Sequence, residues 1–261
     1  FSSRRRHTRF RNVTGVQTCA LPILKSIIRK ALQFFHLDLT KNLKYDRLTK
    51  QIIKTCLSDG GNAVDIGCHK GEILDLFIHY SPKGKHYGFE PIPYLYELLE
   101  KKYGQTAKIF KYAISDKEGE TLFHFVKNAP AYSGLKKRSY PTSSPDIEEI
   151  KVEIKTLDSI IPENEKIKII KIDVEGAELG VLKGAINTIR KNNPVIIFEC
   201  GLGASEYYDT TPEAVYDFLA NECQQRIFTL SNWIAKQSHL TRDQFKTIYH
   251  SKLDYYFVSS R

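Results

Sequence analysis

Residues 64–72 read Val-Asp-Ile-Gly-Cys-His-Lys-Gly-Glu, and residues 170–178 read Ile-Lys-Ile-Asp-Val-Glu-Gly-Ala-Glu. Each stretch is an apolar run that ends in an acid, Asp65 or Asp173, and then opens onto a glycine turn. In open α/β sheets such junctions lie at the carboxyl ends of buried strands, where these sheets bind ligands. The pair therefore predicts a ligand crevice at one end of a parallel sheet.

The segments around these two motifs alternate between strand-like and helix-like patterns from residue 63 onward. This alternation is typical of a parallel sheet covered on both faces. We predict an α/β fold with a Rossmann-like, doubly wound sheet, mostly parallel, closed by extended segments at residues 226–230 and 255–258. The other expected strands are 63–66, 85–90, 108–112, 167–173 and 194–199, and the expected helices are 72–79, 93–103, 177–191 and 212–223.

One interruption lies between the third and fourth of these strands. Residues 121–126 and 151–156 alternate apolar and polar side chains with period two, which predicts added strands that extend an edge of the sheet. Between them, residues 127–145 are rich in Ser, Pro, Lys and Tyr, which indicates an exposed loop. We expect residues 61–261 to form one domain with an insertion at residues 120–156.

The first residues are interpreted separately. Residues 3–9 and 13–23 match the translation of a sequencing-library adapter, so we expect residues 1–23 not to be native and exclude them from the fold. The alternative is a basic targeting or nucleic-acid-binding arm. Without the five arginines of this segment the formal charge falls from +9 to +4, and we then expect no nucleic-acid partner.

Residues 24–60 are expected to form a helical segment. Residues 24–39 carry apolar side chains at helical spacing, which predicts a helix packed on its own domain or, alternatively, on a membrane surface or a partner. A second helix is expected over residues 45–57. The four remaining cysteines lack metal-finger spacing, and no apolar run reaches the roughly 18–20 residues of a spanning helix. These features favour a cytoplasmic protein of undetermined oligomeric state, with peripheral membrane contact left open.

The first motif has the spacing Asp-x-Gly-x-x-x-Gly, with Asp65, Gly67 and Gly71. Glycines let a backbone approach a ligand closely, although glycine turns also serve as plain connectors. A dinucleotide enzyme more often carries Gly-x-Gly-x-x-Gly, and here position 69 is His. Glu90, at the end of the next expected strand, could accept two hydrogen bonds from a ribose diol, or could be a solvated loop acid. The pattern favours a nucleoside ligand without phosphates.

The second motif gathers acids at the end of the fourth strand. Asp173 must face the crevice or lose hydration at considerable cost, so it is the best candidate to touch a cofactor or an acceptor. Glu175 and Glu178 could share this site or could simply favour the positive end of the next helix. Glu199, at the end of the fifth strand, could face the same crevice.

The order of these motifs resembles the FkbM family of S-adenosylmethionine-dependent methyltransferases. The matching stretches are 64–67 with Gly71, 89–91, 113–116, 133–135, 156–158, 169–178 with 181–185, and 194–199. Cys68-His69 stands where such proteins usually carry Ala-Asn. The resemblance implies a class I methyltransferase sheet, S-adenosylmethionine as cofactor, and O-methylation of a hydroxyl on a sugar, glycan or natural-product precursor. The resemblance implies cofactor contacts at Asp65, Gly67, Gly71 and Glu90. We further expect the cofactor to contact Cys68, Pro91, Ala113, Ile114 and Asp173.

Transfer of a methyl group to a hydroxyl requires alignment of the reactants and removal of a proton. Our hypothesis is that Asp173 orients cofactor or acceptor and that Glu175, Glu199 or His69 is the base. The spacing requires no metal. Lys136, Lys137 and Arg138 could gate the acceptor pocket and favour an anionic acceptor, or form a solvated charge run. Two other classes stay open: a nicotinamide-dependent oxidoreductase and a catalytically silent binding module on the same fold.

Overall fold

The computed structural model describes residues 41–140 and 144–261. The chain divides into two compact units, residues 1–47 and 48–261, and the site described below lies wholly in the second. The segment assigned to an adapter and the helix expected over residues 24–39 lie outside the described residues. The helix expected over residues 45–57 is present as α2, Lys41–Leu57.

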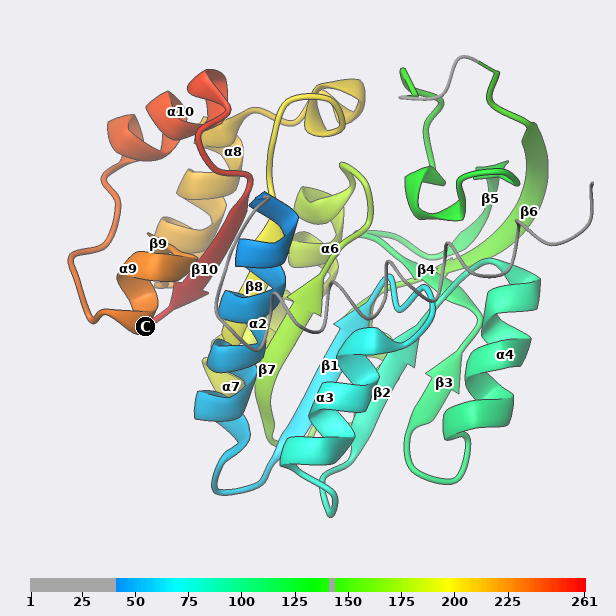
Figure 1. The fold of residues 1–261 in the computed structure, drawn as a ribbon, viewed down its shortest axis with the longest axis horizontal. Coiled ribbons are helices and arrows are strands. Elements are labelled where there is room, and N and C mark those ends of the chain that lie inside the picture. The colour runs from blue at the N-terminus through cyan, green and yellow to red at the C-terminus, as the bar shows by residue number, and fades with distance from the viewer. Residues whose placement is uncertain (1–40, 141–143) are drawn as a thin grey trace, which may run out of the picture. The chain divides into compact units, whose positions relative to one another are not determined.

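A seven-stranded sheet forms the centre of the second unit (Figure 1), and its strands run in the order β3-β2-β1-β7-β8-β10-β9. The first five of these are parallel, and β10 is antiparallel to both β8 and β9. The doubly wound sheet with an antiparallel closing strand is therefore confirmed. The strands are β1 Asn62–Ile66, β2 His86–Phe89, β3 Lys108–Phe110, β7 Ile167–Ile172, β8 Val195–Glu199, β9 Arg226–Thr229 and β10 Tyr256–Ser260.

The parallel strands are rich in Ile, Val and Phe because both faces of the sheet are buried. One face packs against the apolar sides of α6, α7, α8 and α10. Figure 1 shows α3 on the other face, in front of β1 and β2. The helices are α3 Glu72–Tyr80, α4 Pro93–Tyr103, α5 Leu157–Ile160, α6 Glu178–Gly184, α7 Ile186–Asn192, α8 Pro212–Asp217, α9 Leu230–Ile234 and α10 Arg242–Ser251.

The helix expected over residues 177–191 is two helices, α6 and α7, which meet at Ala185. The carboxylate of Asp158 accepts hydrogen bonds from the Asn187 and Thr188 amides at 2.9 and 2.8 Å, and so caps the start of α7. In a similar way, the helix expected over residues 212–223 consists of α8 and a π-helical turn, η3 Phe218–Glu222.

The strand expected over residues 108–112 divides at Lys111, and its second part, β4 Tyr112–Ile114, joins a different sheet. The two period-two segments form β5 Gly119–Val126 and β6 Ile147–Lys155. They pair with each other and with β4 in the order β4-β6-β5, so they do not extend an edge of the large sheet as expected. Phe123, Val152 and Ile154 of this second sheet pack against Ile92 and Leu95 at the start of α4.

The second unit also contains two short 3-10 helices. One, η1 Pro130–Tyr132, lies between β5 and β6, and the other, η2 Ser205–Tyr208, follows β8. Within the described residues, no helix has the length and apolar character needed to span a bilayer.

Candidate active site

The turn after β1 lies directly against the loop after β7. Gly67 has a φ of 87°, and a Cβ at this position would lie 1.9 Å from the carbonyl oxygen of Asp173. The Asp173 amide donates to the carbonyl of Ile66 at 3.0 Å. Only glycine combines this backbone conformation with so close an approach. Gly67 therefore fixes the contact between the two motifs.

The rest of this turn packs against protein. Gly71, at the start of α3, has a φ of 80°, and a Cβ there would lie 2.4 Å from the ring of Tyr103. The Tyr103 hydroxyl donates to the Gly71 carbonyl at 2.8 Å. Cys68 is buried, its thiol donates to the Asp65 carbonyl at 3.3 Å, and burial raises the pKa of that thiol. Gly71 and Cys68 thus stabilise the turn through contacts with the rest of the protein.

Glu90 holds two backbone segments together at the end of β2. Its carboxylate accepts from the His69 amide at 2.8 Å and from the Ile92 amide at 3.0 Å. It is 4% exposed, so it is not a solvated loop acid, and burial raises its pKa to about 7. A carboxylate offers roughly four acceptor positions, so two stay available for a ligand. Glu90 can therefore clamp the loop and bind a ligand at the same time.

A pocket of about 580 Å³, its open mouth included, lies between the turn at Glu90 and the loop at Asp173. Most of its wall is apolar, with Phe89, Ile92 and Phe123 among the side chains that sequence analysis did not single out. Eight predicted site residues line it: Gly67, His69, Glu90, Pro91, Ala113, Ile114, Asp173 and Glu175. The other four, Asp65, Cys68, Gly71 and Glu199, do not.

Asp65 is 1% exposed in β1, next to the pocket-lining turn. Its Oδ2 atom has no hydrogen-bond partner among the described residues. Burial raises the pKa of Asp65 to about 7, against the opposing charge of Lys171 on the adjacent strand position of β7. An orphaned buried carboxyl oxygen is costly, so this atom is a candidate acceptor for a ligand donor.

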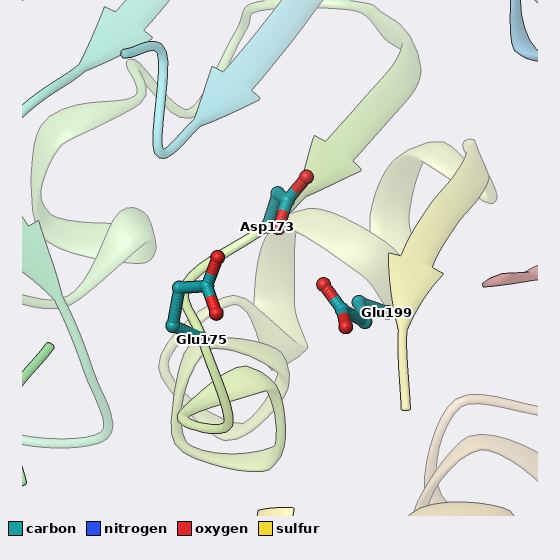
Figure 2. A group of neighbouring side chains, drawn as sticks. All are labelled: Asp173, Glu175 and Glu199. Carbon is teal, nitrogen blue, oxygen red and sulfur yellow. The ribbon is translucent and has the colours of Figure 1, made fainter. Parts of the chain in front are cut away.

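Three carboxyl groups converge at the carboxyl ends of β7 and β8. Figure 2 shows the side chains of Asp173, Glu175 and Glu199 turned toward one another, and one oxygen of each lies within 4.8 Å of the others. Oxygen donors so arranged could attract a cation. Positive charge is already supplied there by Lys171, 3.0 Å from Asp173, and by Arg138, which pairs with Glu175.

The three acids differ in their protonation. Burial alone would raise the pKa of Asp173. The charge of Lys171 and the hydrogen bonds from Tyr256, Lys171 and Glu199 outweigh the effect of burial, so the pKa of Asp173 lies below its usual value. Burial and the neighbouring Asp173 charge raise the pKa of Glu175 to about 8 and raise that of Glu199 well above its usual value. At neutral pH Asp173 is therefore the ionised member, and Glu199 is a protonated donor to it.

His69 lines the pocket from the turn after β1, with a φ of 49°. Burial, together with the nearby charge of Lys70, lowers its pKa, so its ring is neutral at pH 7. Of the three predicted bases, His69 and Glu175 reach the pocket wall and Glu199 does not.

Residues 136–139 lie against the loop after β8. Arg138, whose side chain is 7% exposed, pairs with Glu175 and donates to the Gly203 carbonyl at 3.2 Å. The Tyr208 hydroxyl accepts from the Lys136 amide at 3.0 Å, and the Lys136 ammonium lies 3.4 Å from Asp209. Two of the three cations predicted to attract an anionic acceptor are therefore already paired within the chain.

The family model that describes the Methyltransferase FkbM domain matches residues 65–227, which is more than half of the chain. The chain belongs to the FkbM methyltransferase family. The match begins at Asp65 and includes every pocket-lining residue described above. The strand order and the family together place this FkbM methyltransferase in the class I methyltransferase fold. No protein of curated function matches its sequence significantly.

Solved structures similar to this FkbM methyltransferase include FkbM from Methylobacillus flagellatus KT, at 15% identity and a TM-score of 0.48 over 92% of this chain. The chain spans 60% of that protein's length. An rRNA methylase from Streptococcus thermophilus is 10% identical, with a TM-score of 0.43, and the match covers 82% of this chain and 93% of that one. The plantazolicin methyltransferase BpumL, solved with SAH, is 13% identical, with a TM-score of 0.37 and coverage of 92% and 96%.

Sequence analysis missed the partners that this FkbM methyltransferase places around Asp173. Tyr256 of β10 donates a short hydrogen bond to Asp173 Oδ2, and it comes from 83 residues farther along the chain. Glu178, left open as a site residue, is 2% exposed and accepts from the amides of Val174 and Gly176, both at 3.2 Å. It therefore braces the loop after β7. The sequence placed Tyr256 in an extended segment at residues 255–258, but no pattern indicated that its hydroxyl would reach Asp173.

Proposed function

We propose that this FkbM methyltransferase uses S-adenosylmethionine to methylate a hydroxyl group of a sugar, glycan or natural-product precursor. The observation that carries the proposal is the pair of acids on either side of one apolar pocket: Glu90 at the end of β2 and Asp173 at the end of β7. This pocket lies at β1 and β7, where the strand order of the sheet reverses, which is where doubly wound sheets bind nucleotide-like ligands.

The residues present fit a nucleoside with an amino-acid tail. Glu90 has unused acceptor positions for a ribose diol, and Ile92, Ala113 and Ile114 form an apolar wall for a flat base. Asp173, ionised and facing the pocket, can accept from an ammonium group. The orphaned Oδ2 of Asp65 fits a ligand donor or a bridging water.

When bound, the cofactor supplies a methyl group activated by its sulfonium. The chain has to hold the acceptor hydroxyl in line and take its proton. His69 is neutral at pH 7 and lines the pocket, so we assign it as the first candidate base. Glu175, whose pKa is raised to about 8, is the second candidate only at a pH high enough to ionise its carboxyl group. Glu199 is protonated beside Asp173, so we propose that it is a donor and not the base.

Calorimetric titration with SAH, S-adenosylmethionine and NAD tests the cofactor assignment. We expect SAH to bind with a 1:1 stoichiometry and NAD not to bind. Glu90→Gln keeps one carbonyl oxygen as an acceptor but removes the charge. This variant is expected to weaken SAH binding roughly tenfold, because a hydrogen bond to a charged acceptor is lost. NAD binding without SAH binding would support an oxidoreductase, and binding of neither would support a silent module.

A further inference from the structure

The geometry of the loop after β7 depends on a polar cluster on one face of the sheet. Asp65 of β1 pairs in register with Lys171 of β7, and Glu199 of β8 pairs with Tyr256 of β10. Because side chains on one face of a sheet recur every second residue, Asp173 follows Lys171 on that same face. Residues from four strands thus meet below the pocket.

Lys171 is buried in this cluster, with a side chain that is 4% exposed. Its ammonium lies 3.0 Å from Asp173 Oδ2, 3.5 Å from the Tyr256 hydroxyl and 4.6 Å from the centre of the Tyr256 ring. A buried ammonium is costly unless it is paired and hydrogen-bonded. Here these contacts supply the pairing, so the lysine is confined to one position.

The Tyr256 hydroxyl donates to the same oxygen, Asp173 Oδ2. Two donors on one oxygen leave the carboxylate little freedom to rotate, while 30% of the Asp173 side chain stays exposed toward the pocket. A group so anchored keeps its remaining acceptor positions directed at whatever enters the pocket.

We propose that Lys171 and Tyr256 are positioning residues, which anchor Asp173 through Oδ2 and so present its carboxylate to the ligand in the pocket. This inference rests on the proposed function for the identity of that ligand. The arrangement itself rests only on the contacts given above.

The electrostatics agree with this arrangement. Burial raises the pKa of Tyr256 well above its usual value, so its hydroxyl stays a donor, and Asp173 stays ionised although several acids surround it. The charged and titratable groups that influence Asp173 or lie in its cluster are Asp65, His69, Arg138, Lys171, Glu175, Glu178, Glu199 and Tyr256.

The test compares Tyr256→Phe with Tyr87→Phe in the full chain. Tyr87 is a control of the same chemistry, because its hydroxyl also donates to a carboxylate, Glu165, at 2.6 Å, near the opposite end of β7. Carbon-13 NMR of labelled aspartate carboxyls, with the Asp173 signal assigned by Asp173→Asn, gives the titration midpoint of Asp173. Calorimetry gives the affinity for SAH.

We expect Tyr256→Phe to raise the Asp173 midpoint by about one pH unit and to weaken SAH binding about tenfold, since a donor to the ionised form is lost. Tyr87→Phe should change neither. Lys171→Met should raise the Asp173 midpoint further. If the Lys171→Met protein does not fold, the Tyr256→Phe result alone tests the positioning role. An unchanged Asp173 midpoint in Tyr256→Phe overturns the inference. Failure of the unmodified chain to bind SAH contradicts the proposed function instead, and the midpoint still decides the positioning role.

Discussion

At the scale of single residues, the site depends on one contact between backbones. Gly67 and the carbonyl of Asp173 approach so closely that no side chain fits between them. This contact fixes the distance between the acids of the second motif and the turn that carries His69. A sequence pattern can mark such a glycine, but it does not say what the glycine touches.

Gly67→Ala is expected to destabilise the fold by at least about 2 kcal/mol, because a left-handed alanine is strained and its Cβ would overlap the Asp173 carbonyl. Urea unfolding followed by circular dichroism measures the change. Gly119→Ala is the matched control: its φ is also positive, 137°, but nothing lies within 4 Å of the added Cβ. Equal losses in the two proteins would contradict the role given to the Gly67 contact.

At the scale of elements, two of the differences from the expected secondary structure share a cause. The helix over residues 177–191 is interrupted because Asp158, 29 residues upstream, caps its second half. The strand over residues 108–112 is divided because β4 finds a partner in β6, 41 residues away in its register. Propensity and periodicity describe neighbours along the chain, so neither effect could be predicted from them.

Asp158→Ala should lower the free energy of unfolding by about 1 kcal/mol or more, since two amides at the start of α7 lose their acceptor. Chemical denaturation measures this. Asp158→Asn keeps one oxygen acceptor and should recover part of the loss. If alanine at this position costs no more than asparagine, the cap is not what starts α7.

The segment that carries Arg138 offers a second test at this scale. Arg138→Met keeps much of the side-chain volume but removes the pair with Glu175 and the bond to Gly203, so chymotrypsin should cut after Tyr132 several-fold faster. Lys137→Met is the control, since Lys137 is exposed. Limited proteolysis with mass spectrometry identifies the cuts. Identical cleavage rates in both variants would show that the ion pair does not hold this segment.

At the scale of the whole molecule, the acids set an unusual dependence of stability on pH. Burial raises the pKa of Asp65, Glu90 and Glu178 to about 7 and that of Glu175 to about 8, whereas the unfolded chain ionises these groups near their ordinary values of 3.8 and 4.5. The folded state therefore binds more protons in between, and its stability falls as pH rises through the folded values.

We expect the free energy of unfolding to fall by about 3 kcal/mol between pH 6.5 and pH 8.5, measured by urea denaturation. Asp173 does not contribute in this window, because its pKa is lowered and its effect is lost only on acidification. His69 and His86, whose pKa values are lowered, act below this range. Asp65→Asn should flatten the slope. A stability that is constant or rises over this range would refute the assignment of buried, protonated acids.

The sequence predicted the parallel sheet, its closing strands and eight of the residues that line the pocket. These follow from apolar runs, glycine turns and the ends of strands, all of which are local. It could not predict which acids would be ionised. Asp173 and Glu199 look alike in the sequence, yet one is held charged by Lys171 and Tyr256 and the other is protonated beside it.

The docking of residues 136–139 has a practical consequence. The hydroxyls of Tyr208 and Tyr207 accept from the backbone amides of Lys136 and Ser139 at 3.0 and 3.2 Å. These two hydrogen bonds do not depend on which side chains stand at positions 136 and 139. The exposed side chain of Lys137 can therefore be varied in a library while these backbone hydrogen bonds stay in place. Position 137 is thus the place to vary when the proposed acceptor specificity is tested, whereas Gly67 leaves no room for a side chain.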